Sequence, residues 1–157
     1  MCCPQPRLWC RHSYPGPAGE TTLYVKVAVR VLIVDDRVPF RRVARAVIDA
    51  SEGFEAVGEA SSGEEAVLAA GLLRPDLVLM DVNLPGIDGM EATRRIRSQA
   101  RTDAPVVLLL STWEHDAGCG SQCGAAEYIP KSRLDPQRLA VSWRRARESD
   151  ERRTAAV

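Results

Sequence analysis

Short apolar runs recur along the chain and are separated by segments with helical spacing. Three runs consist almost entirely of aliphatic and β-branched residues: VAVRVLIV (27–34), LVLMD (77–81) and VVLLLS (106–111). Runs of this kind are typical of strands that are covered on both faces of a sheet. Two weaker runs, FEAVGEA (54–60) and AEYI (126–129), bring the predicted set to five strands.

The segment after the first predicted strand has the spacing of an amphipathic helix. Its apolar positions follow the i, i+3, i+4, i+7 and i+8 pattern of one helix face, and its arginines fall on the other face. The predicted inward residues are Phe40, Val43, Ala44, Val47 and Ile48, and the predicted outward residues are Arg41, Arg42 and Arg45.

A second helix is predicted to begin at a capping box formed by Ser62 and Glu65 and to end at Pro75. Its inward residues are expected to be Val67, Ala70 and Leu73. A third, short helix is expected over MEATRRIRSQ (90–99), with Asp88 interpreted as its cap.

A last helix follows the fifth predicted strand. Asp135 is its expected N-cap, Pro136 its first residue, and Leu139 and Trp143 point inward. Strands that alternate with helices in this way predict an α/β fold with a doubly wound parallel sheet. The stretch TWEHDAGCGSQCGA (112–125) is rich in glycine and predicts only a poor helix.

The two ends of the chain have the composition of segments outside a folded core. We expect residues 1–24 to form a disordered leader and residues 148–157 to form a charged tail that frays into solvent. A start codon assigned too far upstream, with the natural start near Val27 or Val29, would produce the same leader. Peptide mapping of the native N-terminus distinguishes the two.

Composition limits the classes of function. The net charge is zero, which argues against sequence-independent binding of nucleic acid. The apolar run at 23–34 is short and is interrupted by Lys26 and Arg30, so it predicts a strand and not a membrane span. Five cysteines, an odd number, occur without a secretory signal, which favours reduced thiols and a cytoplasmic location.

Polar residues stand at the carboxyl ends of four predicted strands. Asp35 and Asp36 end the first, Asp81 the third and Ser111 the fourth, and Lys131 follows the fifth. In an open parallel sheet these ends meet at one edge, where functional groups gather. Carboxylates without His or Cys suit a hard cation such as Mg²⁺. With a hydroxyl and a lysine, they supply what phosphoryl transfer requires.

The segments VLIVDD, LVLMDVNLPGIDG, VVLLLS and GAAEYIPK resemble the ordered motifs of response-regulator receiver domains. The resemblance covers residues 27–147 and implies a receiver domain over residues 25–147. It also implies the flavodoxin-like strand order 2-1-3-4-5. Asp81 is by this resemblance the phosphoacceptor. The implied ligands of Mg²⁺ are Asp35, Asp36, Asp81 and the backbone carbonyl of Asn83. Lys131 is implied to pair with Asp81 and then with the phosphoryl group, Ser111 to report its presence, and Tyr128 to be the aromatic switch.

The resemblance further implies a sensor histidine kinase or histidine phosphotransfer protein as donor. Only 26 residues follow Lys131, which leaves no room for an output module in this sequence. We therefore expect a stand-alone receiver that is not an enzyme. It would signal through an unidentified downstream protein or a phosphorylation-dependent homodimer, without direct contact to nucleic acid or membrane.

Two features depart from the family pattern. The segment between Ser111 and Lys131 is shorter and richer in glycine than usual, which bears on how the signal is transmitted. Pro130 precedes the lysine, and a proline at the end of a strand is tolerated only at a sheet edge.

Structural roles remain open for individual residues. Asp35 and Asp36 could cap a helix, Ser111 could cap the next segment, Asp81 could be a turn residue, Lys131 could form a surface ion pair, and Tyr128 could be ordinary core. His115, Cys119 and Cys123 have the spacing of one helix face that could bind zinc or sense oxidation. Glycines weaken that helix and a fourth ligand is missing, so scattered reduced thiols are the favoured interpretation.

Two other functions use a similar sheet. A phosphorylation-independent pseudo-receiver would keep the fold as an interaction module without the switch. A phosphatase with an aspartate nucleophile would also use Mg²⁺, but its usual Asp-x-Asp motif on the first strand differs from Asp81-Val82-Asn83 on the third.

Overall fold

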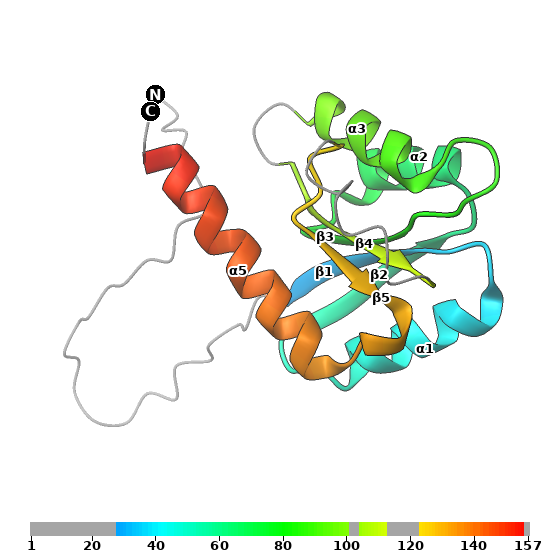
Figure 1. The fold of residues 1–157 in the computed structure, drawn as a ribbon, viewed down its shortest axis with the longest axis horizontal. Helices are drawn as coiled ribbons and strands as arrows, with labels where there is room; N and C mark the ends of the chain where they lie inside the picture. Colours follow the sequence, from blue (N-terminus) through cyan, green and yellow to red (C-terminus); the bar gives the residue numbers. More distant parts are fainter. Residues whose placement is uncertain (1–27, 101–103, 113–122, 156–157) are drawn as a thin grey trace, which may run out of the picture.

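The computed structural model describes residues 28–100, 104–112 and 123–155 (Figure 1). Five parallel strands form one sheet in the order β2-β1-β3-β4-β5. The strands are β1 (Val29–Val34), β2 (Phe54–Ala60), β3 (Leu77–Asp81), β4 (Val106–Ser111) and β5 (Glu127–Pro130). The predicted α/β class, the doubly wound sheet and the strand order are confirmed.

Each face of the sheet has its own apolar core, because successive residues of a strand point to opposite faces. One core packs alternate strand residues such as Ile33, Leu79 and Leu108 against α1 (Val38–Asp49) and α5 (Pro136–Ala155). The other packs Leu32, Met80 and Leu109 against α2 (Gly63–Leu73) and α3 (Gly89–Gln99). Figure 1 shows α2 and α3 on the side of the sheet opposite α1. Burial on both faces explains the continuous apolar runs.

The caps predicted for α3 and α5 are confirmed. The Asp88 carboxylate accepts a hydrogen bond from the Glu91 N–H at 2.7 Å. At α5, the Asp135 carboxylate accepts one from the Arg138 N–H at 2.7 Å. Such side-chain acceptors satisfy donors that a helix N-terminus leaves unpaired.

The capping box of α2 is confirmed in one of its two halves. The Ser62 hydroxyl accepts a hydrogen bond from the Glu65 N–H at 3.2 Å. The Glu65 carboxylate, however, accepts from the N–H and the hydroxyl of Ser61, at 2.7 and 2.8 Å. The helix ends at Leu73, before Arg74 in the left-handed region (φ 46°) and Pro75, as the proline predicts.

The predicted faces of α1 need a correction. Ala44 and Ile48 are fully buried, and Phe40 and Val47 pack against the same core. Val43, however, is 52% exposed, and the Arg41 side chain is only 16% exposed because its guanidinium binds Glu59 of β2 at 3.0 Å. The helix therefore rests on the flank that carries Arg41, and the flank that carries Val43 faces solvent.

The C-terminal end also differs from the prediction. Residues 148–155, the greater part of the predicted tail, continue α5 as helix. Ala146 is the last of the described residues of α5 that is buried, and the exposed Glu148 and Arg152 beyond it lie 4.0 Å apart as an i, i+4 pair. The end of α5 extends past the sheet in Figure 1.

The leader predicted for residues 1–24 lies outside the described residues, as does most of the glycine-rich stretch, 113–122. None of the described helices combines the length and the apolar composition that a membrane crossing requires.

Candidate functional site

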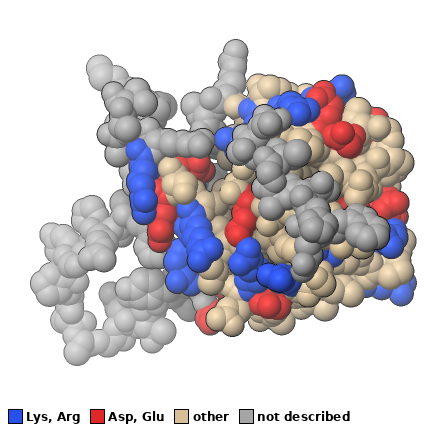
Figure 2. Space-filling view, viewed as in Figure 1, with Lys and Arg blue, Asp and Glu red and all other residues tan. Residues whose placement is uncertain are grey.

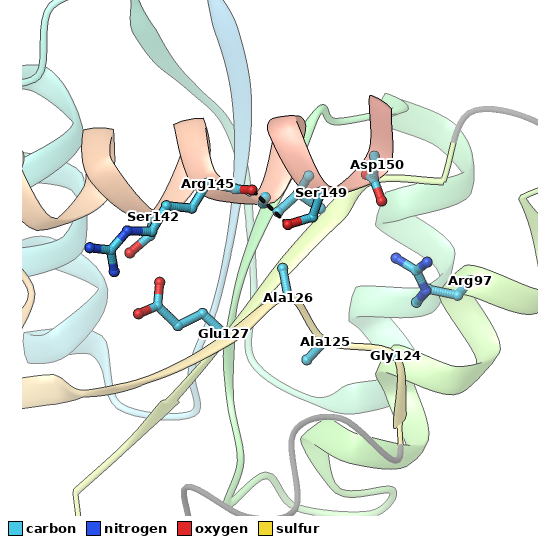
Figure 3. A pocket seen from close by; sticks show the side chains of 11 residues that line it. Arg97, Gly124, Ala125, Ala126, Glu127, Ser142, Arg145, Ser149 and Asp150 are labelled. Atoms are coloured by element: carbon cyan, nitrogen blue, oxygen red, sulfur yellow. Dashed lines mark hydrogen bonds between the residues drawn. The ribbon is translucent and has the colours of Figure 1, made fainter. Parts of the chain in front are cut away.

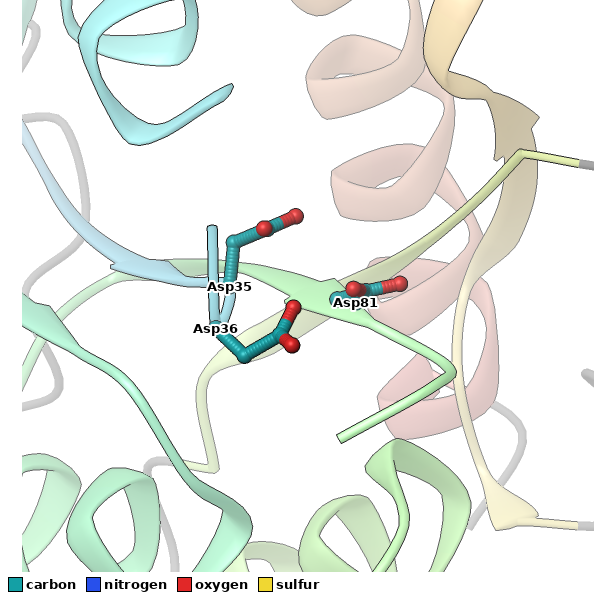
Figure 4. A group of neighbouring side chains, drawn as sticks. All are labelled: Asp35, Asp36 and Asp81. Atoms are coloured by element: carbon teal, nitrogen blue, oxygen red, sulfur yellow. The ribbon is translucent and has the colours of Figure 1, made fainter. Parts of the chain in front are cut away.

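The carboxyl ends of β1 and β3 place three aspartates side by side. Val34, the last residue of β1, pairs with Met80 in the parallel register, so Asp35 follows β1 at the level of Asp81. One carboxylate oxygen from each of Asp35, Asp36 and Asp81 lies within 4.8 Å of the others. Figure 4 shows the Asp36 carboxylate turned toward Asp81. The convergence predicted from the sequence is therefore present.

Two of these carboxylates are removed from solvent. Asp35 is 0% exposed and Asp81 is 2% exposed, whereas Asp36 is exposed. A buried carboxylate requires compensating charge or hydrogen bonds, because burial costs it the hydration that stabilises its ionised form.

Lys131 supplies part of that compensation. It follows β5 as the first residue of the 3₁₀ helix η2 (Lys131–Arg133), and its side chain is 8% exposed. Its ammonium donates to the Asp81 carboxylate at 2.9 Å and also to the Asp35 carboxylate. The sequence predicted the first contact, and the second shows that one lysine bridges the ends of β1 and β3.

Backbone groups complete the surroundings of the two buried carboxylates. The Arg37 N–H donates to Asp35 Oδ1 at 2.9 Å, and the Asn83 N–H donates to Asp81 Oδ1 at 3.2 Å. Each aspartate thus accepts from the residue two positions further along, as in Asx turns. These turns fix the direction of both side chains.

The charge of the cluster is not balanced by Lys131. Burial raises the pKa of Asp81, while the hydrogen bond and charge of Lys131 lower it and the charge of Asp35 raises it again, with a net rise above the ordinary value of 3.8. The Lys131 ammonium contacts two of the three carboxylates, Asp35 and Asp81, and the three together form a group that could hold a metal ion. Its all-oxygen donors fit a hard ion that keeps several waters, such as Mg²⁺.

Ser111 and Tyr128 lie on the two strands beyond β3. Ser111 ends β4, is fully buried and pairs in register with Pro130, while its neighbour Leu110 pairs with Asp81. Tyr128 is partly buried and packs on the face covered by α2 and α3. Pro130 ends an edge strand, as its missing N–H required.

A family model described as the response regulator receiver domain matches residues 31–143. The chain belongs to the response regulator receiver family. The order of its strands and the position of its acidic cluster are those that the motif resemblance implied.

Curated relatives of this receiver domain include a methylesterase and a regulator. A protein-glutamate methylesterase/protein-glutamine glutaminase of Alkalilimnicola ehrlichii is 38% identical over 111 residues, which are 68% of this chain and 28% of that protein. The nitrate/nitrite response regulator protein NarL of Escherichia coli is 32% identical over 116 residues, 74% of this chain and 53% of that protein. The chain therefore spans only about a quarter to a half of these relatives.

Solved structures agree in fold over nearly their whole length. The response regulator domain of Thermotoga maritima CheB has a TM-score of 0.67 and 29% identity, covering 76% of this chain and 97% of that chain. A chain of the CheX-CheY-BeF3-Mg+2 complex from Borrelia burgdorferi is also similar, with a TM-score of 0.62 and 27% identity, covering 72% of this chain and 84% of that chain.

Three residues near the acidic cluster of the receiver domain were not predicted as part of the site. The Phe40 ring centroid lies 4.5 Å from the Lys131 ammonium. Arg41 donates to the Asp35 carbonyl oxygen at 2.8 Å, and the Arg37 guanidinium reaches the Thr112 hydroxyl at 3.4 Å. Arg37, Phe40 and Arg41 follow Asp35 and Asp36 within six positions of the sequence. This closeness is the only signal in the sequence that points to them.

The possible zinc or redox site at His115, Cys119 and Cys123 falls mostly on residues that the structure does not describe. His115 and Cys119 lie outside the described residues, and Cys123 is buried against the core on the α2 and α3 side.

A pocket of about 470 Å³ lies at the other end of the strands of this receiver domain (Figure 3). It is bordered by Val106 and Glu127, which begin β4 and β5, and by α5, whose Ser149 hydroxyl donates to the Arg145 carbonyl at 3.0 Å. Its charged lining residues, of both signs, are Arg97, Glu127, Arg145 and Asp150. The carboxyl-end cluster, not this pocket, carries the chemistry typical of the fold.

On the face shown in Figure 2, basic and acidic side chains are interleaved. Along α5, Arg144, Arg145 and Arg147 are followed by Glu148 and by further residues of both signs. This mixture is typical of a solvated surface and not of a nucleic-acid interface, which needs a continuous basic patch.

Proposed function

We propose that this receiver domain accepts a phosphoryl group on Asp81 from a histidine kinase or a histidine phosphotransfer protein. The observation that carries the proposal is the convergence of Asp35, Asp36 and Asp81 with Lys131 at one edge of the sheet. A surface-capping or turn role for these residues would not require them to meet.

In the proposed reaction a carboxylate oxygen of Asp81 attacks the phosphorus of a phosphohistidine. A P–O bond forms, the P–N bond breaks, and the imidazole of the donor leaves with the bonding electron pair. The product is an acyl phosphate on Asp81. Most of the rate of such a transfer comes from positioning and from stabilisation of charge on the phosphoryl oxygens.

Each neighbouring group has a role in that charge stabilisation. Asp35, Asp36, Asp81 and the carbonyl of Asn83 are the proposed ligands of Mg²⁺, which when bound supplies positive charge toward the carboxylates and the phosphoryl oxygens. The Lys131 ammonium exchanges its contact with the Asp81 carboxylate for a phosphoryl oxygen. The Ser111 hydroxyl donates to another phosphoryl oxygen.

Phosphorylation is proposed to shift an existing equilibrium, with Ser111 drawn toward the phosphoryl group and Tyr128 turning further inward. The change would be read by a downstream protein or by a second copy of the receiver. The domain then acts through protein contacts in the cytoplasm and not as an enzyme that converts a separate substrate. The CheX-CheY-BeF3-Mg+2 complex supports this proposal, because a complex with a chain of similar fold contains beryllofluoride, a phosphoryl analogue, and Mg²⁺.

The proposal is tested by incubating the protein with acetyl phosphate and Mg²⁺ and measuring its intact mass. We expect the wild type to gain one phosphoryl group, and Asp81→Asn and the chelator-treated wild type to gain none. A wild type without mass gain, or an equal gain in Asp81→Asn, would overturn the proposal. Partner binding that ignores both Asp81→Asn and beryllofluoride would then identify a phosphorylation-independent interaction module.

A further inference from the structure

Lys131 has a third neighbour in addition to its two carboxylates. An ammonium carries three N–H donors, and two of them are directed at Asp35 and Asp81. The ring of Phe40 lies over the same nitrogen, with 4.5 Å between the nitrogen and the ring centroid. The lysine side chain is only 8% exposed, so the ammonium is held between two carboxylates and an aromatic face.

The ring that contacts the ammonium is itself well anchored. Phe40 lies in the first turn of α1, where its N–H donates to the Arg37 carbonyl at 3.1 Å. Its side chain packs against the core beneath α1 and α5. The helix begins three residues after Asp35, so the acidic pair and the ring belong to one continuous segment. The position of the ring is thereby tied to that of the carboxylates.

An anchored ring restricts the position of the lysine ammonium, which the flexible lysine side chain does not do by itself. Lysine is a point charge on a flexible four-carbon stem, and the other polar contacts of its ammonium with the described part of the chain are those with the two carboxylates. An aromatic face within about 6 Å attracts a cation, and more strongly when the pair is removed from water. This attraction acts over the ring face and does not use one particular N–H of the ammonium, so the ammonium can change its hydrogen-bond partner without leaving the ring.

We propose that Phe40 is a positioning residue that holds the Lys131 ammonium over the site while its partner changes from the Asp81 carboxylate to a phosphoryl oxygen. The inference rests on the proposed function of Asp81 and adds a residue that acts through Lys131. Phe40 does not touch the reacting atoms. Its aromatic face is the property that matters, and its apolar volume alone is insufficient.

The test is a titration of the full chain with beryllofluoride in the presence of Mg²⁺, followed by calorimetry. Phe40→Leu keeps an apolar side chain without a π face, so the ammonium is no longer held over the site before the ligand binds and must be ordered on binding. The expected loss of affinity is about three- to thirtyfold, with the strength of a cation–π contact as its upper bound. Phe40→Tyr keeps the ring and is expected to bind like the wild type. In a Lys131→Met background, Phe40→Leu is expected to have no further effect.

The outcomes separate the inference from the function on which it rests. A wild type that does not bind beryllofluoride overturns both. A wild type that binds while Phe40→Leu binds equally well, or an equal loss from Phe40→Leu with and without Lys131, overturns only the role of Phe40. If Phe40→Leu does not fold, as judged by circular dichroism, Phe40→Met takes its place in the same cycle.

A second readout does not depend on any ligand. The chain contains only two lysines, Lys26 and Lys131, so their ε-methylene NMR signals are assigned by a single Lys131→Met variant. The ring current of Phe40 is expected to shift the Lys131 signal upfield in the wild type and in Phe40→Tyr but not in Phe40→Leu. Identical Lys131 signals in the wild type and Phe40→Leu would exclude the contact.

Discussion

At the scale of single residues, the site has an electrostatic imbalance: two buried carboxylates share one ammonium. Asp81 is 2% exposed and lies beside the equally buried Asp35, and both depend on the single ammonium of Lys131. Burial raises the pKa of Asp81 in spite of that ammonium. The ionised carboxylate is therefore less stable in the folded protein than in the unfolded chain.

This imbalance predicts that Asp81→Asn stabilises the metal-free protein at neutral pH. A carboxyl whose folded pKa is raised lowers stability as pH rises through that pKa, whereas below its unfolded value of 3.8 no loss occurs. The melting temperature of Asp81→Asn should exceed that of the wild type at pH 7, and the gap should narrow as pH falls toward 4. Thermal unfolding in chelator checks this.

Addition of Mg²⁺ should reverse the order of the two melting temperatures, so that the wild type melts above Asp81→Asn. A ligand at 100 times its dissociation constant stabilises the folded state by about 2.7 kcal/mol, and only the wild type retains all three carboxylates. Asp49→Asn, at an exposed position on α1, is the matched control and should behave like the wild type throughout. A metal-free Asp81→Asn that melts below the wild type would contradict this account of the imbalance.

The acidic site residues could be predicted because they interrupt apolar strands at their carboxyl ends, and the carboxyl ends of parallel strands meet at one edge of the sheet. The role of Phe40 could not be predicted, because the helical apolar spacing already accounts for this residue. Nothing in that spacing indicates a contact with a lysine 91 positions away. Its contact depends on the tertiary meeting of α1 with the end of β5.

At the scale of elements, the start of α3 is held against the phosphoacceptor strand. A Cβ on Gly89, the first residue of α3, would lie 2.0 Å from the carbonyl oxygen of Asp81. The carbonyl of Asp81 and the Cα of Gly89 that would carry the Cβ both belong to the backbone, so neither can move without its strand or helix. Only glycine permits this approach of α3 to the end of β3.

Gly89→Ala should therefore destabilise the domain by about 1–3 kcal/mol, the usual cost of overpacking, and should slow phosphorylation by moving Asp81. Gly71→Ala is the matched control, because nothing lies within 4 Å of the added Cβ in α2. Gly71→Ala replaces a glycine inside a helix and should stabilise the domain by up to about 1 kcal/mol. Urea unfolding of both variants measures the difference, and equal effects would exclude the steric role of Gly89.

All five strands could be predicted within two residues, because buried parallel strands leave continuous apolar runs. The orientation of α1 could not, because the apolar stripe does not show which flank the neighbouring strand covers, and Glu59 of β2 draws Arg41 inward. The length of α5 was also missed. Between Ala146 and Arg152 no described side chain is buried, so the helix continues there without the apolar spacing that marks a helix in sequence.

At the scale of the whole molecule, the fold brings together groups that lie 96 positions apart in the chain, from Asp35 to Lys131. The sheet supplies the edge, α1 supplies the ring beneath the lysine, and α3 supports the end of β3. The family match and the similar solved structures agree with the fold of this sheet and its helices. The central claim is that one carboxylate of this cluster, Asp81, receives the phosphoryl group.

The most direct measurement is to locate that group chemically. Borohydride reduces an aspartyl phosphate to homoserine, so peptide mass spectrometry after treatment with acetyl phosphate, Mg²⁺ and borohydride identifies the modified position. We predict homoserine at position 81 and unmodified aspartate at positions 35 and 36. Reduction at either of those two positions, or an unmodified position 81 in protein that has gained a phosphoryl group, would contradict the account.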